Sequence, residues 1–212
     1  MRRAAVALLC CALASTAWAD EAGHPVSLWR AEGASNSVYL LGSIHLLRAE
    51  DHPLPRVFDV AYADAEVLVM ELDMDDLDPA CTQAAFNSAG VLRDGSTLRD
   101  LIGEERYARA EETAALLDIP LDMLDRSEPW LAAITVELLI LYRSGFDPRL
   151  GIEMTMTERA TSDGKPIEGL ETVDEQLSFL DGLSLDAQAE MLLQTLEQGT
   201  ELRDSIDTMI GA

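Results

Sequence analysis

The stretch VYLLGSIHLL, residues 38–47, joins an apolar run to a glycine and a histidine. The run is typical of a strand, and a similar run over residues 26–31 precedes it across a turn-rich segment containing Gly33 and Asn36. We therefore predict a hairpin with strands near 26–31 and 37–45. His45 would lie at the end of the second strand.

A helix and another strand are predicted after this hairpin. Residues 54–61 place apolar side chains at helical spacing behind two prolines, and EVLVMELD over 66–73 is a short apolar run bounded by charge. The second pattern is typical of a strand buried on both faces. Strand, helix and strand within about 35 residues indicate a β-α-β crossover between the strands at 37–45 and 66–73.

The rest of the chain is predicted to be mainly helical. Asp78-Pro79 begins a helix towards Gly90, an apolar stripe covers 97–118, and residues 128–146 form the central core helix. The sequence thus predicts an α/β fold, helix-rich in its C-terminal half, in which many helices surround one small mixed β-sheet. The strands of that sheet are expected near 26–31, 37–45, 66–73 and 166–171.

Residues 1–19 have the pattern of a secretory signal peptide: Arg2-Arg3, an apolar run, and Ala17-Trp18-Ala19. Cleavage after Ala19 would leave a single domain over 20–212, exported to the periplasm or the extracellular space. A bilayer span needs roughly 20 apolar residues. No later segment meets this length, so no transmembrane segment is expected in the mature chain.

The charge of the chain is strongly acidic, with 39 acidic and 15 basic residues and a net charge of -24. Nucleic acids and anionic membranes need a basic surface, so they are excluded as partners. Cations and cationic peptides would be attracted. Solubility or a salty habitat explains the same charge without any binding function.

Two residues at predicted strand ends are candidates for a functional site. His45 is either a structural histidine or a ligand, and Gly42 before it leaves room for backbone or substrate. Glu71 ends the next strand, where a buried carboxylate requires a partner, a proton or a cation. Its alternative is a solvent-facing place at a frayed strand end. A histidine and a glutamate at neighbouring strand ends form half of a divalent-metal site.

Two further glutamates occupy similar positions. Glu153 follows Gly151 at a predicted helix start, where it is either a metal ligand or a charge that complements the helix dipole. Glu171 ends the predicted strand near 166–171, in a context similar to that of Glu71.

Three stretches in this order resemble the TraB/PrgY/GumN family, which includes the TIKI-type metalloproteases: SVYLLGSIHLL, AEVLVMELDM and GIEMTMTERATSDGKPIEGLETVDEQLSFL. The resemblance extends from about Trp29 to Ile210. It implies a mixed α/β fold and, for catalytic members, divalent-metal-dependent peptide hydrolysis. It matches His45 to the histidine of the first G-x-x-H motif and Glu71 to the glutamate that follows. Glu171 and Gln176 match a later stretch of the family.

The sequence also departs from the family pattern, because members carry a second G-x-x-H motif nearer the C-terminus. No histidine follows His52 here. The domain is therefore expected to be C-terminally incomplete relative to the family. A truncated gene product, a member that has lost activity, and a partner chain that supplies the rest are the alternatives.

Two functions are predicted. The first is an exported divalent-metal-dependent hydrolase, specifically a peptidase, that uses Mn, Co or Zn and acts on a peptide or protein. Its predicted metal ligands are His45, Glu71 and Glu153. Its predicted catalytic carboxylates are Glu71 and Glu171, and its predicted substrate contacts are Gly42 and Gln176. The second function is a noncatalytic peptide- or partner-binding protein that keeps the family groove but lacks a complete metal site.

Overall fold

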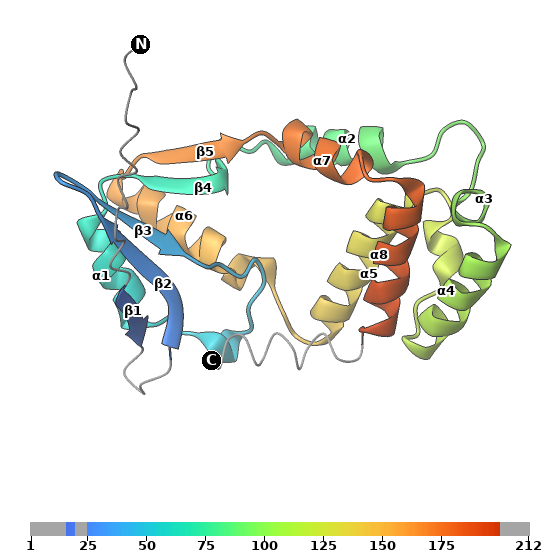
Figure 1. Cartoon of the computed structure of the whole chain (residues 1–212), viewed down its shortest axis with the longest axis horizontal. Coiled ribbons are helices and arrows are strands. Elements are labelled where there is room, and N and C mark those ends of the chain that lie inside the picture. Colours follow the sequence, from blue (N-terminus) through green and yellow to red (C-terminus); the bar gives the residue numbers. More distant parts are fainter. Residues whose placement is uncertain (1–15, 20–24, 200–212) are drawn as a thin grey trace, which may run out of the picture. The chain divides into compact units, whose positions relative to one another are not determined.

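The computed structural model describes residues 16–19 and 25–199 (Figure 1). Backbone contacts divide the chain into two compact units, residues 1–43 with 54–65 and residues 44–53 with 66–212. His45 and Glu71 belong to the second unit, whereas Gly42 belongs to the first. Most of the predicted signal peptide, residues 1–15, lies outside the described residues, and its last residues form strand β1, Thr16–Ala19.

The first unit contains an antiparallel sheet in the order β1-β2-β3 and helix α1. β2 (Pro25–Glu32) and β3 (Ser37–Leu41) form the predicted hairpin. α1 (Arg56–Asp64) is the helix predicted behind two prolines. Tyr39 of β3 donates a hydrogen bond of 2.7 Å to the carboxylate of Asp64. The hairpin and the helix are therefore confirmed.

The second hairpin strand is shorter than predicted. β3 ends at Leu41, and His45 lies in a bend beyond it rather than at the strand end. The last bond to the hairpin is made by Gly42, whose N–H donates to the carbonyl of Ser27 at 2.7 Å. Beyond this point the backbone of residues 44–47 bonds to a different segment of the chain, and this ends the strand.

The predicted single sheet is wrong, although all four predicted strands exist. Among the described residues, β4 (Leu68–Leu72) pairs in parallel with β5 (Ile167–Glu171), and β3 pairs with β2. The expected β-α-β crossover between the strands at 37–45 and 66–73 is therefore also wrong. Periodicity identifies a strand but carries no information about its partner, and β4 finds its partner far along the chain.

Helix α6 (Ile152–Asp163) lies against one face of the β4–β5 sheet. Thr157 of α6 donates a 3.5 Å hydrogen bond to the sulfur of Met70, which is buried on this face. On the opposite face, Val69 and Leu170 are 48% and 73% exposed. The prediction that residues 66–73 are buried on both faces is wrong, because only one face of this strand pair is covered within the described residues.

A helical core occupies the rest of the second unit. α4 (Glu104–Leu116), α5 (Pro129–Arg143) and α8 (Leu185–Glu197) pack together, and Figure 1 shows α5 and α8 side by side. Alanines with no exposed surface let these backbones approach closely. They are Ala110, Ala114, Ala132, Ala133 and Ala189.

The apolar stripe over 97–118 forms two helices instead of one. α3 (Leu98–Ile102) is separated from α4 by Gly103, whose φ of +83° lies in the left-handed region. This conformation is accessible to glycine and ends the first helix.

The other elements follow the predicted order. α2 (Pro79–Gly90) begins at Asp78, whose carboxylate accepts a 2.8 Å hydrogen bond from the N–H of Cys81. The remaining elements are α7 (Val173–Asp181) and the short 3-10 helices η1 (Ala49–Asp51), η2 (Leu121–Leu124) and η3 (Pro148–Leu150). The predicted α/β class with a helix-rich C-terminal half is confirmed. In the described part of the chain, no helix has both the length and the apolar character to cross a membrane.

Candidate functional site

His45 is held by backbone hydrogen bonds between residues 44–47 and residues 147–152. The N–H of Ile152 donates to the carbonyl of Ile44 at 3.1 Å, and Leu47 and Asp147 exchange two bonds of 3.3 and 2.8 Å. These bonds place the bend that carries His45 against the N-terminus of α6.

Gly151 allows this close approach. A Cβ at this position would clash with the carbonyl group of His45, lying 2.6 Å from its carbon. Gly151 is buried and has an ordinary φ of -58°, so the space it leaves matters rather than an unusual backbone conformation. The glycine three residues before His45 attracted attention in the sequence, whereas this one, far along the chain, contacts it.

Glu153, in the first turn of α6, makes the closest polar contact with His45. Its Oε1 lies 2.9 Å from Nδ1 of His45, and the two side chains are 16% and 68% exposed. The hydrogen bond to Glu153 raises the pKa of His45, while burial opposes the shift. The charges of Glu153, Glu71 and Glu137 raise this pKa further. The imidazole is therefore oriented at Nδ1, and Nε2 is the nitrogen through which it would meet a ligand.

Glu71 and Gln176 lie together, as their joint prediction as site residues requires. The side-chain amide of Gln176, in the first turn of α7, donates a 3.3 Å hydrogen bond to Oε2 of Glu71. Glu71 is exposed, which decides between the two alternatives left open by the sequence in favour of the solvent-facing one. Its side chain belongs to the uncovered face of the β4–β5 sheet. Its negative charge nevertheless contributes to the raised pKa of His45.

Glu171 lies apart from these residues. It pairs in register with Leu72, so side-chain alternation places it on the sheet face of Met70, opposite Glu71. The hydrogen bonds and ion pairs of the described residues do not join it to His45. Its catalytic role stays a prediction from the sequence.

Gly42 is explained by its own hairpin. A Cβ there would lie 2.8 Å from the Cβ of Ser27, so the glycine permits close approach of the neighbouring strand. This is the backbone approach that the sequence suggested. A contact between Gly42 and substrate stays a prediction.

Sequence reasoning missed Glu137, the carboxylate of α5 that acts on His45. Burial raises the pKa of Glu137, and the charge of His45 partly offsets this shift. A signal was present, because Glu137 is the only charged residue between Glu128 and Arg143 in the most apolar helix of the chain. An isolated acid in such a helix is costly to bury and points to a partner.

His52 also contacts the start of α6. Its Nε2 lies 2.8 Å from the carbonyl oxygen of Leu150, just before Gly151. This bond is a further tie between the segment carrying His45 and the start of α6.

The donor chemistry around His45 partly fits a divalent ion. An imidazole with carboxylates nearby suits Mn, Co or Zn. In the described residues, however, no three His, Cys, Asp or Glu side chains are gathered closely enough to hold a metal. Oε1 of Glu153, the nearest carboxylate oxygen, is already bonded to Nδ1 of His45. An ion here would therefore require side chains to move.

The fold and this site define an α/β protein with a histidine–carboxylate centre at the N-terminus of a helix. The model of the TraB/PrgY/gumN family matches residues 27–212. The chain therefore belongs to the TraB/PrgY/gumN family, as its motifs indicated. Neither the curated proteins nor the solved structures gave a significant match.

Proposed function

We propose that this chain is an exported divalent-metal-dependent hydrolase that cleaves peptide bonds. The observation that carries the proposal is the oriented, exposed imidazole of His45 within the field of Glu153, Glu71 and Glu137. Family membership supports it, because the resemblance implies metal-dependent peptide hydrolysis for the catalytic members. Export is proposed from the signal-peptide pattern of residues 1–19.

The proposed ligands are Nε2 of His45 and Oε1 of Glu71. Glu153 orients the ring through Nδ1, the arrangement by which carboxylates fix metal-binding histidines in many proteins. Gln176 holds the other oxygen of Glu71 and so restricts its rotation. Catalytic zinc sites typically take about three ligands from the protein. Glu153, predicted from the sequence as a ligand, serves here to orient the ring, and no third ligand stands beside His45 and Glu71 in the described residues.

A divalent ion bound there would act as a Lewis acid on the scissile carbonyl. The residues of the chain then have separate tasks. Glu153 fixes the tautomer of His45 by accepting a hydrogen bond from Nδ1. A carboxylate that is not a ligand would take the proton from the attacking water and pass it to the leaving amine.

The test is a metal analysis of the full chain after dialysis against Mn, Co or Zn. Wild type is expected to retain a stoichiometric ion, and His45→Ala to lose it. Glu112→Gln is the matched control, since Glu112 is an exposed carboxylate on α4, outside the β4–β5 sheet. Equal metal content in wild type and His45→Ala would exclude this metal centre.

Cleavage of a fluorogenic peptide library separates the two predicted functions. The hydrolase loses turnover on chelation and in His45→Ala. A noncatalytic binding protein shows no turnover in wild type, while His45→Ala still binds peptide as well as wild type does.

A further inference from the structure

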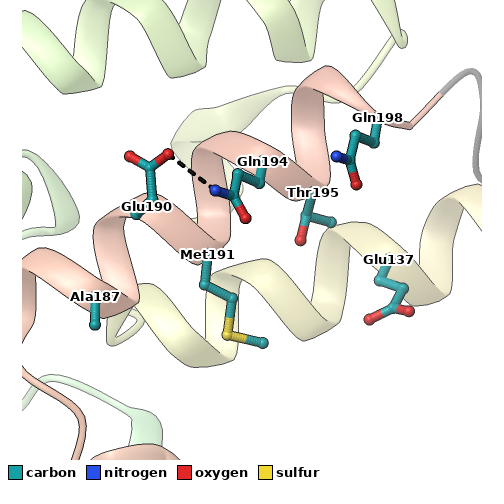
Figure 2. Close-up of a pocket in the computed structure, with 7 residues that line it drawn as sticks. All are labelled: Glu137, Ala187, Glu190, Met191, Gln194, Thr195 and Gln198. Atoms are coloured by element: carbon teal, nitrogen blue, oxygen red, sulfur yellow. Dashed lines mark hydrogen bonds between the residues drawn. The ribbon is translucent and has the colours of Figure 1, made fainter.

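A groove lies between α5 and α8. It has a volume of about 400 Å³. Its lining consists chiefly of Glu137 of α5, four residues of α8 and the residue that follows α8, namely Glu190, Met191, Gln194, Thr195 and Gln198. Figure 2 shows the carboxylate of Glu137 on one helix and the side chains of Met191 and Thr195 on the other. Glu137 lines this groove, and its charge also acts on His45.

The lining side chains have a consistent chemistry. Two are carboxylates, and Gln194 and Gln198 carry amides that both donate and accept hydrogen bonds, as a peptide group does. Met191 adds an apolar, adaptable surface. No lysine or arginine lines the groove. The combination suits a polypeptide segment that brings a positive charge.

The neighbouring arginines are engaged by other acids of α8. Arg106 of α4 pairs with Asp186 at 2.7 Å, and Arg109 of α4 pairs with Glu197. On the groove side, Glu190 accepts a 3.0 Å hydrogen bond from the amide of Gln194 (Figure 2). These arginines therefore pair with Asp186 and Glu197, which do not line the groove, and not with Glu137 or Glu190.

Glu137 is the strongest position for a cation. Its side chain is half-buried in an apolar helix, where a carboxylate gains most from an ionic partner. A guanidinium or ammonium group could reach it from solvent along the open groove.

We propose that the α5–α8 groove binds an extended basic peptide, with Glu137 receiving an arginine or lysine side chain and Gln194 and Gln198 bonding the peptide backbone. This inference deepens the proposed function by naming its substrate class. Only the cleavage of the bound peptide depends on the proposed function. Binding itself requires no metal and no turnover.

The test measures binding to the full chain by fluorescence anisotropy in the presence of a chelator. The probe is a fluorescein-labelled peptide of alternating alanine and arginine, with an alanine–glutamate peptide as the charge control. Wild type should bind the arginine peptide and not the glutamate peptide. Because hydrolysis is absent under these conditions, failure of the proposed activity does not affect the result.

Glu137→Gln is expected to weaken binding of the arginine peptide about tenfold. Glu112→Gln, on exposed α4, removes the same charge elsewhere and should leave binding unchanged. The double variant Gln194→Ala/Gln198→Ala changes only exposed side chains and should weaken binding several-fold, which keeps the test decisive if Glu137→Gln fails to fold. Absent binding, equal binding of both peptides, or equal weakening by Glu137→Gln and Glu112→Gln would overturn the proposal.

Discussion

Oε1 of Glu153 lies 2.9 Å from Nδ1 of His45 and links the first turn of α6 to the bend after the hairpin. Glu153 is the less exposed partner of the pair, and His45 the more exposed. A contact of this kind fixes one ring nitrogen and leaves the other for a ligand. The pKa of His45 therefore reports whether its hydrogen bond to Glu153 is formed.

Glu153→Gln is expected to lower the pKa of His45, because the largest cause of its elevation is the hydrogen bond to Glu153. The raised pKa means that the pair stabilises the folded state fully below the ordinary histidine pKa of about 6.5. This contribution is lost as the pH rises through the folded pKa. An NMR titration of the histidine ring protons measures the shift.

The control for this titration is Glu158→Gln, an exposed glutamate on the same helix. It should leave the His45 pKa unchanged. An unaltered His45 pKa in Glu153→Gln would contradict the pairing. Signals of the other histidines are assigned with His45→Ala.

Gly151→Ala is expected to displace His45, because the added Cβ would clash with its carbonyl group. Forcing a backbone shift of this kind typically costs about 1–3 kcal/mol. Chemical denaturation measures the free energy of unfolding, and the His45 ring signals report the displacement.

Gly164→Ala is the matched comparison at the other end of α6. Gly164 has a φ of +67° and open space around a Cβ, so alanine there costs about 1–2 kcal/mol through backbone conformation. It should destabilise the protein without moving the His45 signals. If both variants changed these signals equally, Gly151 would have no specific role in placing His45.

Gln188→Leu is expected to destabilise the second unit by about 1–3 kcal/mol. Gln188 is only 2% exposed and accepts a hydrogen bond from the N–H of Trp130 at the start of α5. Its amide also donates to the carbonyls of Asp181 and Leu183, at 3.4 and 3.1 Å. Leucine would leave these backbone groups without their buried partner.

Thermal and chemical unfolding test this effect against Gln83→Leu on exposed α2. That control should change stability by no more than about 0.5 kcal/mol. Similar losses in both variants would show that the buried amide contributes nothing specific.

Tyr107→Phe is expected to lose about 1.5–3 kcal/mol, because the phenol donates a 2.7 Å hydrogen bond to the carboxylate of Asp125. Burial and this bond raise the pKa of Tyr107 to about 12. The stabilisation is therefore complete below the ordinary tyrosine pKa of about 10 and declines as the pH rises towards the folded value.

Phenolate absorbance follows this titration, and the variant should lack the late-ionising tyrosine. Tyr142→Phe serves as the control, since Tyr142 is 50% exposed and should alter stability little. A titration curve that Tyr107→Phe leaves unchanged would refute the assignment.

Much of the secondary structure was predictable because its signals are local. The turn-rich segment before Ser37 marks the hairpin, Asp78-Pro79 marks the start of α2, and Gly164 marks the end of α6. Gly103 was overlooked, since the apolar stripe continues across it although its backbone is left-handed. Hydrophobic periodicity shows which side of a helix is buried, but it does not show where one helix ends and the next begins.

The residues of the candidate site also fall into those that the sequence indicated and those that it missed. The family motifs indicated His45, Glu71, Glu171 and Gln176, and a predicted helix start indicated Glu153. Two contacts among these residues, His45 with Glu153 and Glu71 with Gln176, are present. Glu137 and Gly151 escaped notice, because their importance depends on segments that are distant in the sequence. The sequence left open whether Glu71 is buried or faces solvent, because the exposure of a strand face depends on what covers it.

The sequence by itself determined the α/β class, the order of helices and strands, the acidic charge and the family, because these follow from local patterns of residue type. Only the tertiary structure decided that the strands divide into two sheets, that the missing Cβ of Gly151 lets the backbone of His45 approach α6, where Glu153 bonds its ring, and that Glu137 lines a groove. The physical reason is that strand partners and side-chain neighbours are selected by packing between distant segments, which no local pattern records.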